Sequence, residues 1–242
     1  MYIRPSVPTA ASNKEVDSTF GVSGLLWRDS LVLYDRATQS LWSQVLGQAV
    51  AGPREGERLR ELPSQLTTWG DWKRRHPDTV ILRQQERLRG SSYDRYHRDP
   101  KRVGIHGSGN PDPRLPIKAL VYGVEAADAT AAASLITLQE AGLVQGVLPA
   151  TGGSPIPVVV FSVAEEAGAA VAFRRDVAGR ILSFQKEDGQ TVRDRETGSR
   201  WLRESGECTA GALQGLRLSP IKGTLVYWGV WAQFHPKTGL LY

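Results

Sequence analysis

Apolar residues occur along most of the chain in short runs separated by glycine, proline and charged residues. Short apolar runs bounded by turn-forming residues are typical of β-strands. In the second half, this pattern predicts strands at residues 117–124, 157–161, 169–173 and 180–184. A turn is expected at 176–179, between the last two of these strands. The pattern therefore predicts a protein that is rich in strands.

Two segments have the features of helices. The Ala- and Leu-rich segment 129–141 is followed by Gly142, a residue type that commonly terminates a helix. Trp69, Trp72 and His76 are spaced at i, i+3 and i+7, so a helix would place them on one face. The proline that follows the histidine is expected to end that helix. Strands and helices together predict the α+β class.

The chain repeats its own sequence. Residues 35–82, the first block, align without a gap with residues 194–241, the second block, and 19 of the 48 aligned pairs are identical. Each block begins with an Asp-Arg pair and contains a His-Pro pair near its end. A repeat of this length indicates a duplicated domain rather than a solenoid. We therefore expect two homologous units, each containing one block.

The two units differ in length. In the second unit, 115–242, the block is preceded by 79 residues, whereas 34 residues precede it in the first unit, 1–82. We expect the first unit to be N-terminally truncated, with apolar surface exposed near residues 20–27. The second unit, a partner or a missing N-terminal segment would cover this face. Residues 83–114 are basic and rich in Gly and Pro, which predicts a surface linker.

Charge gives little support for a nucleic-acid or membrane role. The 242 residues carry a formal net charge of +5, and much of it lies within residues 83–102. Acids are mixed with the bases there, so we expect a solvated connector and no nucleic-acid partner. No apolar run of about 18 residues is present, so no transmembrane segment is expected. Residues 1–13 lack the apolar core of a signal peptide.

Motifs for known chemistry are scarce. Cys208 is the one cysteine, which excludes an internal disulfide and a multi-cysteine metal site. The chain contains no nucleophile elbow, phosphate-binding loop or His-Glu-x-x-His pattern. No metal site is therefore expected, and the sequence does not identify a cofactor.

The repeated histidines are the strongest candidates for acid–base chemistry. Histidine titrates near neutral pH and acts as a general base when a carboxylate orients it. His235 with Asp194 forms one candidate pair, and His76 with Asp35 forms the other. The alternative is structural, because a His-Pro pair is also suited to the C-terminal end of a helix.

The Asp-Arg pairs allow two interpretations. The guanidinium groups of Arg36 and Arg195 are suited to orienting a carboxylate or phosphate. Alternatively, Asp35 and Asp194 stabilise the turn while each arginine pairs across the strands. We favour the structural interpretation of both pairs.

The repeated tryptophans also allow two interpretations. Aromatic side chains line many ligand pockets, but tryptophans at helical spacing more commonly pack in a core. Packing must be reproduced in both units, whereas one active site is enough, so we favour packing. The six positions are Trp42, Trp69, Trp72, Trp201, Trp228 and Trp231.

The motifs resemble those of the prokaryotic domain-of-unknown-function 3179 family (DUF3179). The resemblance covers nearly the whole chain, and the segments that carry it are Phe20-Gly-Val-Ser-Gly-Leu-Leu26, Tyr34-Asp-Arg-Ala-Thr-Gln-Ser-Leu-Trp-Ser-Gln44, Gly47-x-Ala49-x-x-Gly52 and Trp69-x-x-Trp72-x-x-x-His76-Pro-Asp-Thr79. It implies a bacterial or archaeal protein, often secreted or membrane-attached, without established activity. Many relatives carry a Cys-Pro-x-Cys element where this chain has Phe161-Ser-Val-Ala164, so a redox or metal role is not implied here.

We therefore expect an uncharacterised binding or structural domain in an extracytoplasmic compartment. The alternative is a hydrolase-like enzyme that uses His235 with Asp194 and Arg195, or His76 with Asp35. Polar groups converging on a histidine would favour the enzyme, whereas a dry cage of tryptophans would favour a structural role.

Overall fold

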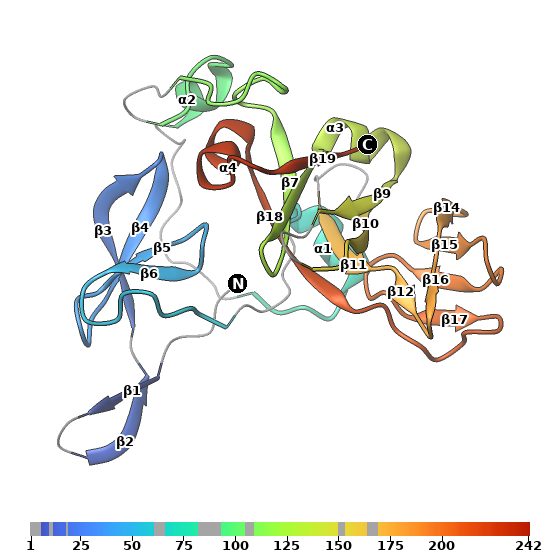
Figure 1. Ribbon diagram of the computed structural model, residues 1–242, viewed down its shortest axis with the longest axis horizontal. Helices are drawn as coiled ribbons and strands as arrows, with labels where there is room; N and C mark the ends of the chain where they lie inside the picture. Colours follow the sequence, from blue (N-terminus) through green and yellow to red (C-terminus); the bar gives the residue numbers. More distant parts are fainter. Residues whose placement is uncertain are drawn as a thin grey trace.

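The computed structural model describes residues 6–9, 12–17, 19–60, 66–81, 93–104, 109–149, 153–163 and 169–242. Figure 1 shows a central sheet with a four-stranded sheet on either side of it. No helix in this part of the chain is long and apolar enough to cross a bilayer. The prediction of a strand-rich protein is confirmed.

The central sheet has seven strands in the order β19-β8-β7-β18-β11-β10-β9. Neighbouring strands are antiparallel except β19 and β8, which are parallel. All seven come from the second half of the chain: β7 (Leu120–Ala126), β8 (Ala129–Ser134), β9 (Leu143–Leu148), β10 (Ile156–Ser162), β11 (Ala170–Arg174), β18 (Pro220–Tyr227) and β19 (Gly239–Leu241). Strand β10 is buried along its whole length, which explains its almost uninterrupted apolar sequence.

The segment 129–141 differs from its prediction. Its first half, Ala129–Ser134, forms β8, and only Leu135–Ala141 forms the helix α3. The alanines of β8 pair with β7 and are mostly buried, so strand pairing overrides the helix propensity of alanine. The predicted terminator is confirmed, because Gly142 adopts the left-handed conformation and its N–H donates to the Leu138 carbonyl.

Each block contributes to a four-stranded antiparallel sheet. The first sheet consists of β3 (Phe20–Trp27), β4 (Ser30–Asp35), β5 (Leu41–Ser43) and β6 (Gln48–Ala51). The second consists of β14 (Phe184–Lys186), β15 (Thr191–Asp194), β16 (Arg200–Leu202) and β17 (Cys208–Ala210). In each sheet the strands follow one another in chain order, as expected for consecutive hairpins.

The two four-stranded sheets contain the same aromatic contact. Phe20 meets Trp42 edge-on with 5.7 Å between ring centroids, and Phe184 meets Trp201 edge-on at 6.0 Å. Both tryptophans are fully buried. Each sheet is therefore organised around one tryptophan on its third strand.

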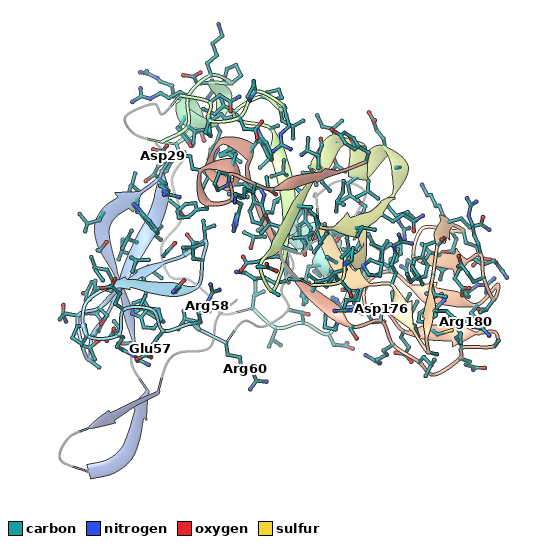
Figure 2. All side chains as sticks on the ribbon, viewed as in Figure 1. Asp29, Glu57, Arg58, Arg60, Asp176 and Arg180 are labelled. Atoms are coloured by element: carbon teal, nitrogen blue, oxygen red, sulfur yellow. The ribbon has the colours of Figure 1, made fainter. Side chains whose placement is uncertain are left out.

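Shorter elements complete the fold. The backbones of β1 (Ser6–Thr9) and β2 (Ser12–Asp17) form a hairpin. Strands β12 (Asp176–Val177) and β13 (Arg180–Ile181) form a short hairpin, so the turn predicted at 176–179 is confined to 178–179 and the strand predicted at 180–184 ends at Ile181. Figure 2 shows Asp176 and Arg180 beside the second four-stranded sheet. The segment expected to be a linker contains α2 (Asp94–Arg98) and a fully buried residue, Val103, which its Gly/Pro-rich composition did not predict.

Each block contains a seven-residue helix close to its end, α1 (Trp69–Arg75) in the first and α4 (Trp228–Phe234) in the second. The helix predicted from the Trp-Trp-His spacing is therefore confirmed. A histidine follows each helix as its C-cap, and its backbone N–H donates to a tryptophan carbonyl in the preceding turn.

Helix α4 contacts the first four-stranded sheet. Phe234 meets Trp27 edge-on with 5.1 Å between ring centroids. Arg28 Nη1 donates to the Gln233 carbonyl at 2.5 Å, and Gln233 Nε2 donates to Asp29 Oδ2 at 3.4 Å. Figure 2 shows Asp29 at the end of the β3–β4 hairpin that faces α4. A hairpin from the N-terminal part of the chain therefore packs against a helix from its C-terminal part.

Candidate functional site

Helix α1 begins at a hydrogen-bonded N-cap. Thr68 Oγ1 accepts from the Asp71 N–H at 3.2 Å, and Thr67 Oγ1 donates to Asp71 Oδ2 at 2.8 Å. Asp71 is buried, and its carboxylate pairs with Arg74 and Arg75 on the same helix. Burial raises the pKa of Asp71, but hydrogen bonds from Thr67 and Arg75 outweigh it and hold this pKa below its ordinary value. The N-terminal part of α1 therefore carries a fixed carboxylate.

An ion pair joins α1 to the second four-stranded sheet. Arg75 Nη1 lies 2.5 Å from Glu204 Oε1, and Glu204 lies in the turn between β16 and β17. Burial lowers the pKa of Arg75, but its hydrogen bonds to Glu204 and Asp71 raise it overall. His76 Nε2 lies 3.5 Å from the same oxygen of Glu204. Residues far apart in the sequence therefore meet at the C-terminal end of α1.

A pocket of about 510 Å³ opens beside this contact. Its volume falls within the usual range for small-molecule sites, roughly 300–1,000 Å³. The walls come from α1, the end of α3, the β14–β15 turn and the end of β10. The charged side chains in these walls are Asp71, Arg74, Arg75, Lys186, Arg203 and Glu204.

Two cationic side chains converge on the end of α3. Arg203 is only 6% exposed, and its Nη1 and Nη2 donate to the carbonyls of Ser162 and Asp188 at 3.0 and 2.9 Å. A Cβ added to Gly142 would lie 3.3 Å from Lys186 Cδ and 3.6 Å from Arg203 Nη1. The left-handed glycine therefore lets both side chains approach the C-terminal end of the helix, where positive charge is favoured.

The pocket has more positive than negative charge. Four of its side chains are basic and two are acidic, and both acids already pair with arginines of α1. Lys186 forms no ion pair with any residue that the structure describes. A concave site with this balance attracts anions, and arginine and lysine are the usual ligands of carboxylate and phosphate groups.

The repeated aspartates are anchored in their own turns. Asp35 and Asp194 are fully buried, and each accepts the N–H of a threonine three residues later at 2.6 Å. The indoles of Trp42 and Trp201 donate to the same carboxylates at 3.0 and 2.8 Å. Burial raises the pKa of Asp35, but the bonds from Trp42 and Thr38 hold it below its ordinary value.

The repeated arginines lie at the surface. Arg36 Nη1 donates to the Tyr34 hydroxyl at 3.0 Å, with its guanidinium 5.4 Å from the centre of that ring. Arg195 is exposed, and its backbone N–H donates to the Ser183 carbonyl at 2.9 Å. Neither side chain is among those that line the pocket.

The repeated histidines occupy matching environments. His76 stacks on Trp72 and His235 on Trp231, at 4.1 and 4.0 Å between ring centroids. The Nε2 atom of each ring is buried and has no hydrogen-bond partner among the described residues. Burial is the main effect on the pKa of His235 and lowers it. The charge of Glu125 raises this pKa and that of Lys222 lowers it, both to a smaller extent.

The expected acid–base pairs are not assembled in this arrangement. His235 follows α4, whereas Asp194 ends β15, and Figure 1 shows these elements in separate parts of the molecule. The carboxylate that lies next to His76 belongs to Glu204, whereas Asp35 is held in its own turn. Each aspartate accepts a hydrogen bond from the tryptophan of its own sheet. The carboxylate therefore fixes the position of that tryptophan and does not orient a histidine.

Burial divides the repeated tryptophans into two groups. Trp42, Trp201, Trp228 and Trp231 are buried, whereas Trp69 is 46% exposed and Trp72 is half-buried. Trp72 and Trp231 each donate an indole hydrogen bond to a threonine seven residues later at 2.9 Å. The first-block helix therefore leaves one tryptophan open where the second-block helix does not.

Sequence reasoning missed the four basic side chains of the pocket, Lys186 and Arg203 among them. Arg203 aligns with Gln44, so the two blocks differ at this position, and Lys186 precedes the second block. The positions that are identical in the two blocks are mainly residues that both sheets and both helices need for packing. The difference between Gln44 and Arg203 is one sequence signal that could have pointed to the pocket.

The described residues give no indication of a metal or thiol centre. No group of three or more His, Cys, Asp or Glu among them is placed to hold a metal ion. Cys208 is buried, and burial raises the pKa of its thiol, which disfavours the reactive thiolate. Ser162 and Val163, from the region where relatives are expected to carry Cys-Pro-x-Cys, line the pocket; Ala164 lies outside the described residues.

The chain belongs to a family of proteins of unknown function. The family model described as a protein of unknown function (DUF3179) matches residues 7–238, nearly the entire chain. The family resemblance inferred from the motifs is therefore confirmed, and membership brings no established activity. No curated protein and no solved structure matches the chain.

Proposed function

We propose that this chain is a non-catalytic binding domain that holds a small anion, with a carboxylate or phosphate group, in the pocket beside α1. The observation that carries the proposal is the convergence of Arg203 and Lys186 at Gly142, inside a cavity of about 510 Å³. A buried guanidinium binds an anion more strongly than an exposed one, because less water competes for it.

Binding is favoured over a hydrolase-like role. An acid–base mechanism needs a histidine oriented by a carboxylate and aimed at a substrate. Asp194 and Asp35 instead accept hydrogen bonds from their own turns and tryptophans. The pocket itself offers cations that bind and orient a ligand. We therefore propose that the pocket binds its ligand and does not cleave a bond in it.

We further propose that the two blocks descend from one duplicated unit, with residues 1–82 and 115–242 as the two copies and 83–114 between them. The sequence identities support this, and so do the equivalent contacts. Both sheets use an indole-to-aspartate bond, and both helices use an indole-to-threonine bond. The family resemblance is the basis for proposing an extracytoplasmic location.

The binding proposal is tested by titrating the full chain with inorganic phosphate and with citrate at low ionic strength, followed by calorimetry. We expect saturable binding that Lys186→Gln weakens about tenfold, the effect of losing one charge-assisted hydrogen bond. Lys237→Gln is the matched control, because Lys237 is exposed and does not line the pocket. Equal losses in both variants, or no saturable binding of either anion, would exclude the proposed site.

Two acidic residues that are close to the pocket in the sequence allow a second test. Glu165 and Glu166 follow the lining residue Val163 in the sequence and lie outside the described residues. A double variant, Glu165→Gln with Glu166→Gln, removes their charge. Anion binding that appears only in this variant would mean that the pocket is neutralised internally, which contradicts a ligand-binding role.

A further inference from the structure

An apolar surface is exposed on either side of α1. Leu66 and Trp69 precede or begin the helix, and Val80 and Ile81 follow it; they are 65%, 46%, 92% and 67% exposed. These four residues are called the α1 apolar surface. Apolar side chains exposed to this extent and close together along the chain mark an interaction site in many soluble proteins.

The aligned residues of the second block are covered by a hairpin. Leu66, Trp69 and Ile81 align with Leu225, Trp228 and Leu240. Leu225 is paired with Tyr122 of β7, and Leu240 with Ala132 of β8. Trp228 is fully buried in a cluster with Val121 of β7 and Ala132 of β8. The β7–β8 hairpin therefore covers in the second block what is exposed in the first.

Within the described residues, no strand pairs with the segment after α1. Val80 and Ile81 belong to no strand, whereas the aligned Gly239 and Leu240 lie in β19, which pairs with β8 in parallel. The sequence Val-Ile-Leu at 80–82 is suited to the same pairing. An unpaired, apolar strand edge is a template for β-augmentation.

The β7–β8 hairpin also shows which residues such a partner needs. A Cβ added to Gly123 of β7 would lie 2.4 Å from the Trp231 ring, so a glycine is required where the helix tryptophan packs. The residues of β8 that pair with β19 are the small Ala131, Ala132 and Ala133. Trp72 aligns with Trp231 and is half-buried. A strand that packs on Trp72 in the same way would also need a glycine facing the ring.

We infer that the α1 apolar surface binds, in trans, an antiparallel β-hairpin of the β7–β8 type, with glycine opposite Trp72 and small apolar residues along Val80 and Ile81. The inference rests on the proposed equivalence of the two blocks and does not depend on the anion pocket. The hairpin adds strands beside Val80 and Ile81 and covers Trp69, as β7–β8 covers Trp228.

The test uses the full chain and a synthetic peptide with the sequence of residues 120–134. Calorimetry should give binding of one peptide to one chain. Ile81→Asp should weaken binding about tenfold, because a charge would replace a buried apolar contact. Ile136→Asp is the matched control, since Ile136 is also 67% exposed but lies on α3.

A second peptide tests the packing requirement. Placing valine at the position of Gly123 should abolish binding, because its side chain would overlap the Trp72 ring. Equal binding of both peptides, or equal effects of the two isoleucine variants, would overturn the inference. Self-association of the chain that Ile81→Asp abolishes, without peptide binding, would assign this surface to a second copy and also overturn it. Lys186→Gln should leave peptide binding unchanged, which separates this result from the anion proposal.

Discussion

Arg75 and Glu204 form an ion pair of 2.5 Å between two segments that are 129 residues apart in the sequence. The aligned positions, Phe234 and Val45, lie together in a buried apolar cluster. Each block therefore sends its C-terminal helix to the turn of the other block. The Arg75–Glu204 contact is charged and borders a pocket, whereas Phe234 and Val45 belong to a closely packed apolar cluster.

The charged contact should contribute measurably to stability. Glu204→Gln leaves Arg75 only partly paired, and the Arg75 side chain is 12% exposed. We expect a loss of about 1–2 kcal/mol in the free energy of unfolding, measured in urea. Glu207→Gln is the control, because its partner Arg217 is mostly exposed, and it should cost less than about 0.5 kcal/mol. Equal effects would show that α1 does not depend on this pair.

The two tryptophans that begin the helices should differ in their effect on stability. Trp228→Ala empties a fully buried site, so we expect a loss of about 3–5 kcal/mol in denaturant melts. Trp69→Ala removes a side chain that is 46% exposed and should cost less than about 1 kcal/mol. Similar losses at both positions would mean that Trp69 is covered in solution.

The second residue of each helix is a glycine, and the same substitution should have opposite effects at the two positions. A Cβ on Gly229 would lie 2.5 Å from Ile117 Cγ1, whereas a Cβ on Gly70 meets nothing within 4 Å. Gly229→Ala should therefore destabilise by about 1–3 kcal/mol through overpacking. Gly70→Ala should stabilise by up to about 1 kcal/mol through helix propensity. Thermal melts of the two variants test this difference directly.

The half-buried His235 should make stability depend on pH. Burial lowers the pKa of this ring below its ordinary value of 6.5, so the folded state holds it neutral while the unfolded state takes up a proton. The free energy of unfolding is then highest above pH 6.5 and falls as the pH drops through 6.5 toward the folded-state pKa. His235→Gln should flatten this dependence in urea titrations, and an unchanged slope would contradict it.

The sequence predicted the elements that depend on local pattern. The apolar runs located β7, β10 and β11 of the central sheet, the tryptophan spacing located α1, and Gly142 marked the end of α3. The prediction for 129–134 was wrong because alanine favours a helix locally, while β7 supplies a strand partner that periodicity does not reveal.

The pocket was less predictable than the fold. It joins side chains that the fold brings together from residues 71 to 204, and their charges become a site only when α1 lies on the second sheet. The histidines and aspartates attracted attention because they repeat. Repetition identified the residues that both sheets need for packing, since each aspartate holds a buried tryptophan.

The crossed placement of the two helices has a consequence for how the chain reaches its native state. Contacts such as Arg28–Gln233 and Arg75–Glu204 close loops of well over a hundred residues, so loop-closure entropy must be lost before they can form. Once formed, these contacts hold the N-terminal and C-terminal halves of the chain together at two separate places. A single protease cut between residues 82 and 92 would then leave two fragments that remain associated, each holding the helix that completes the other.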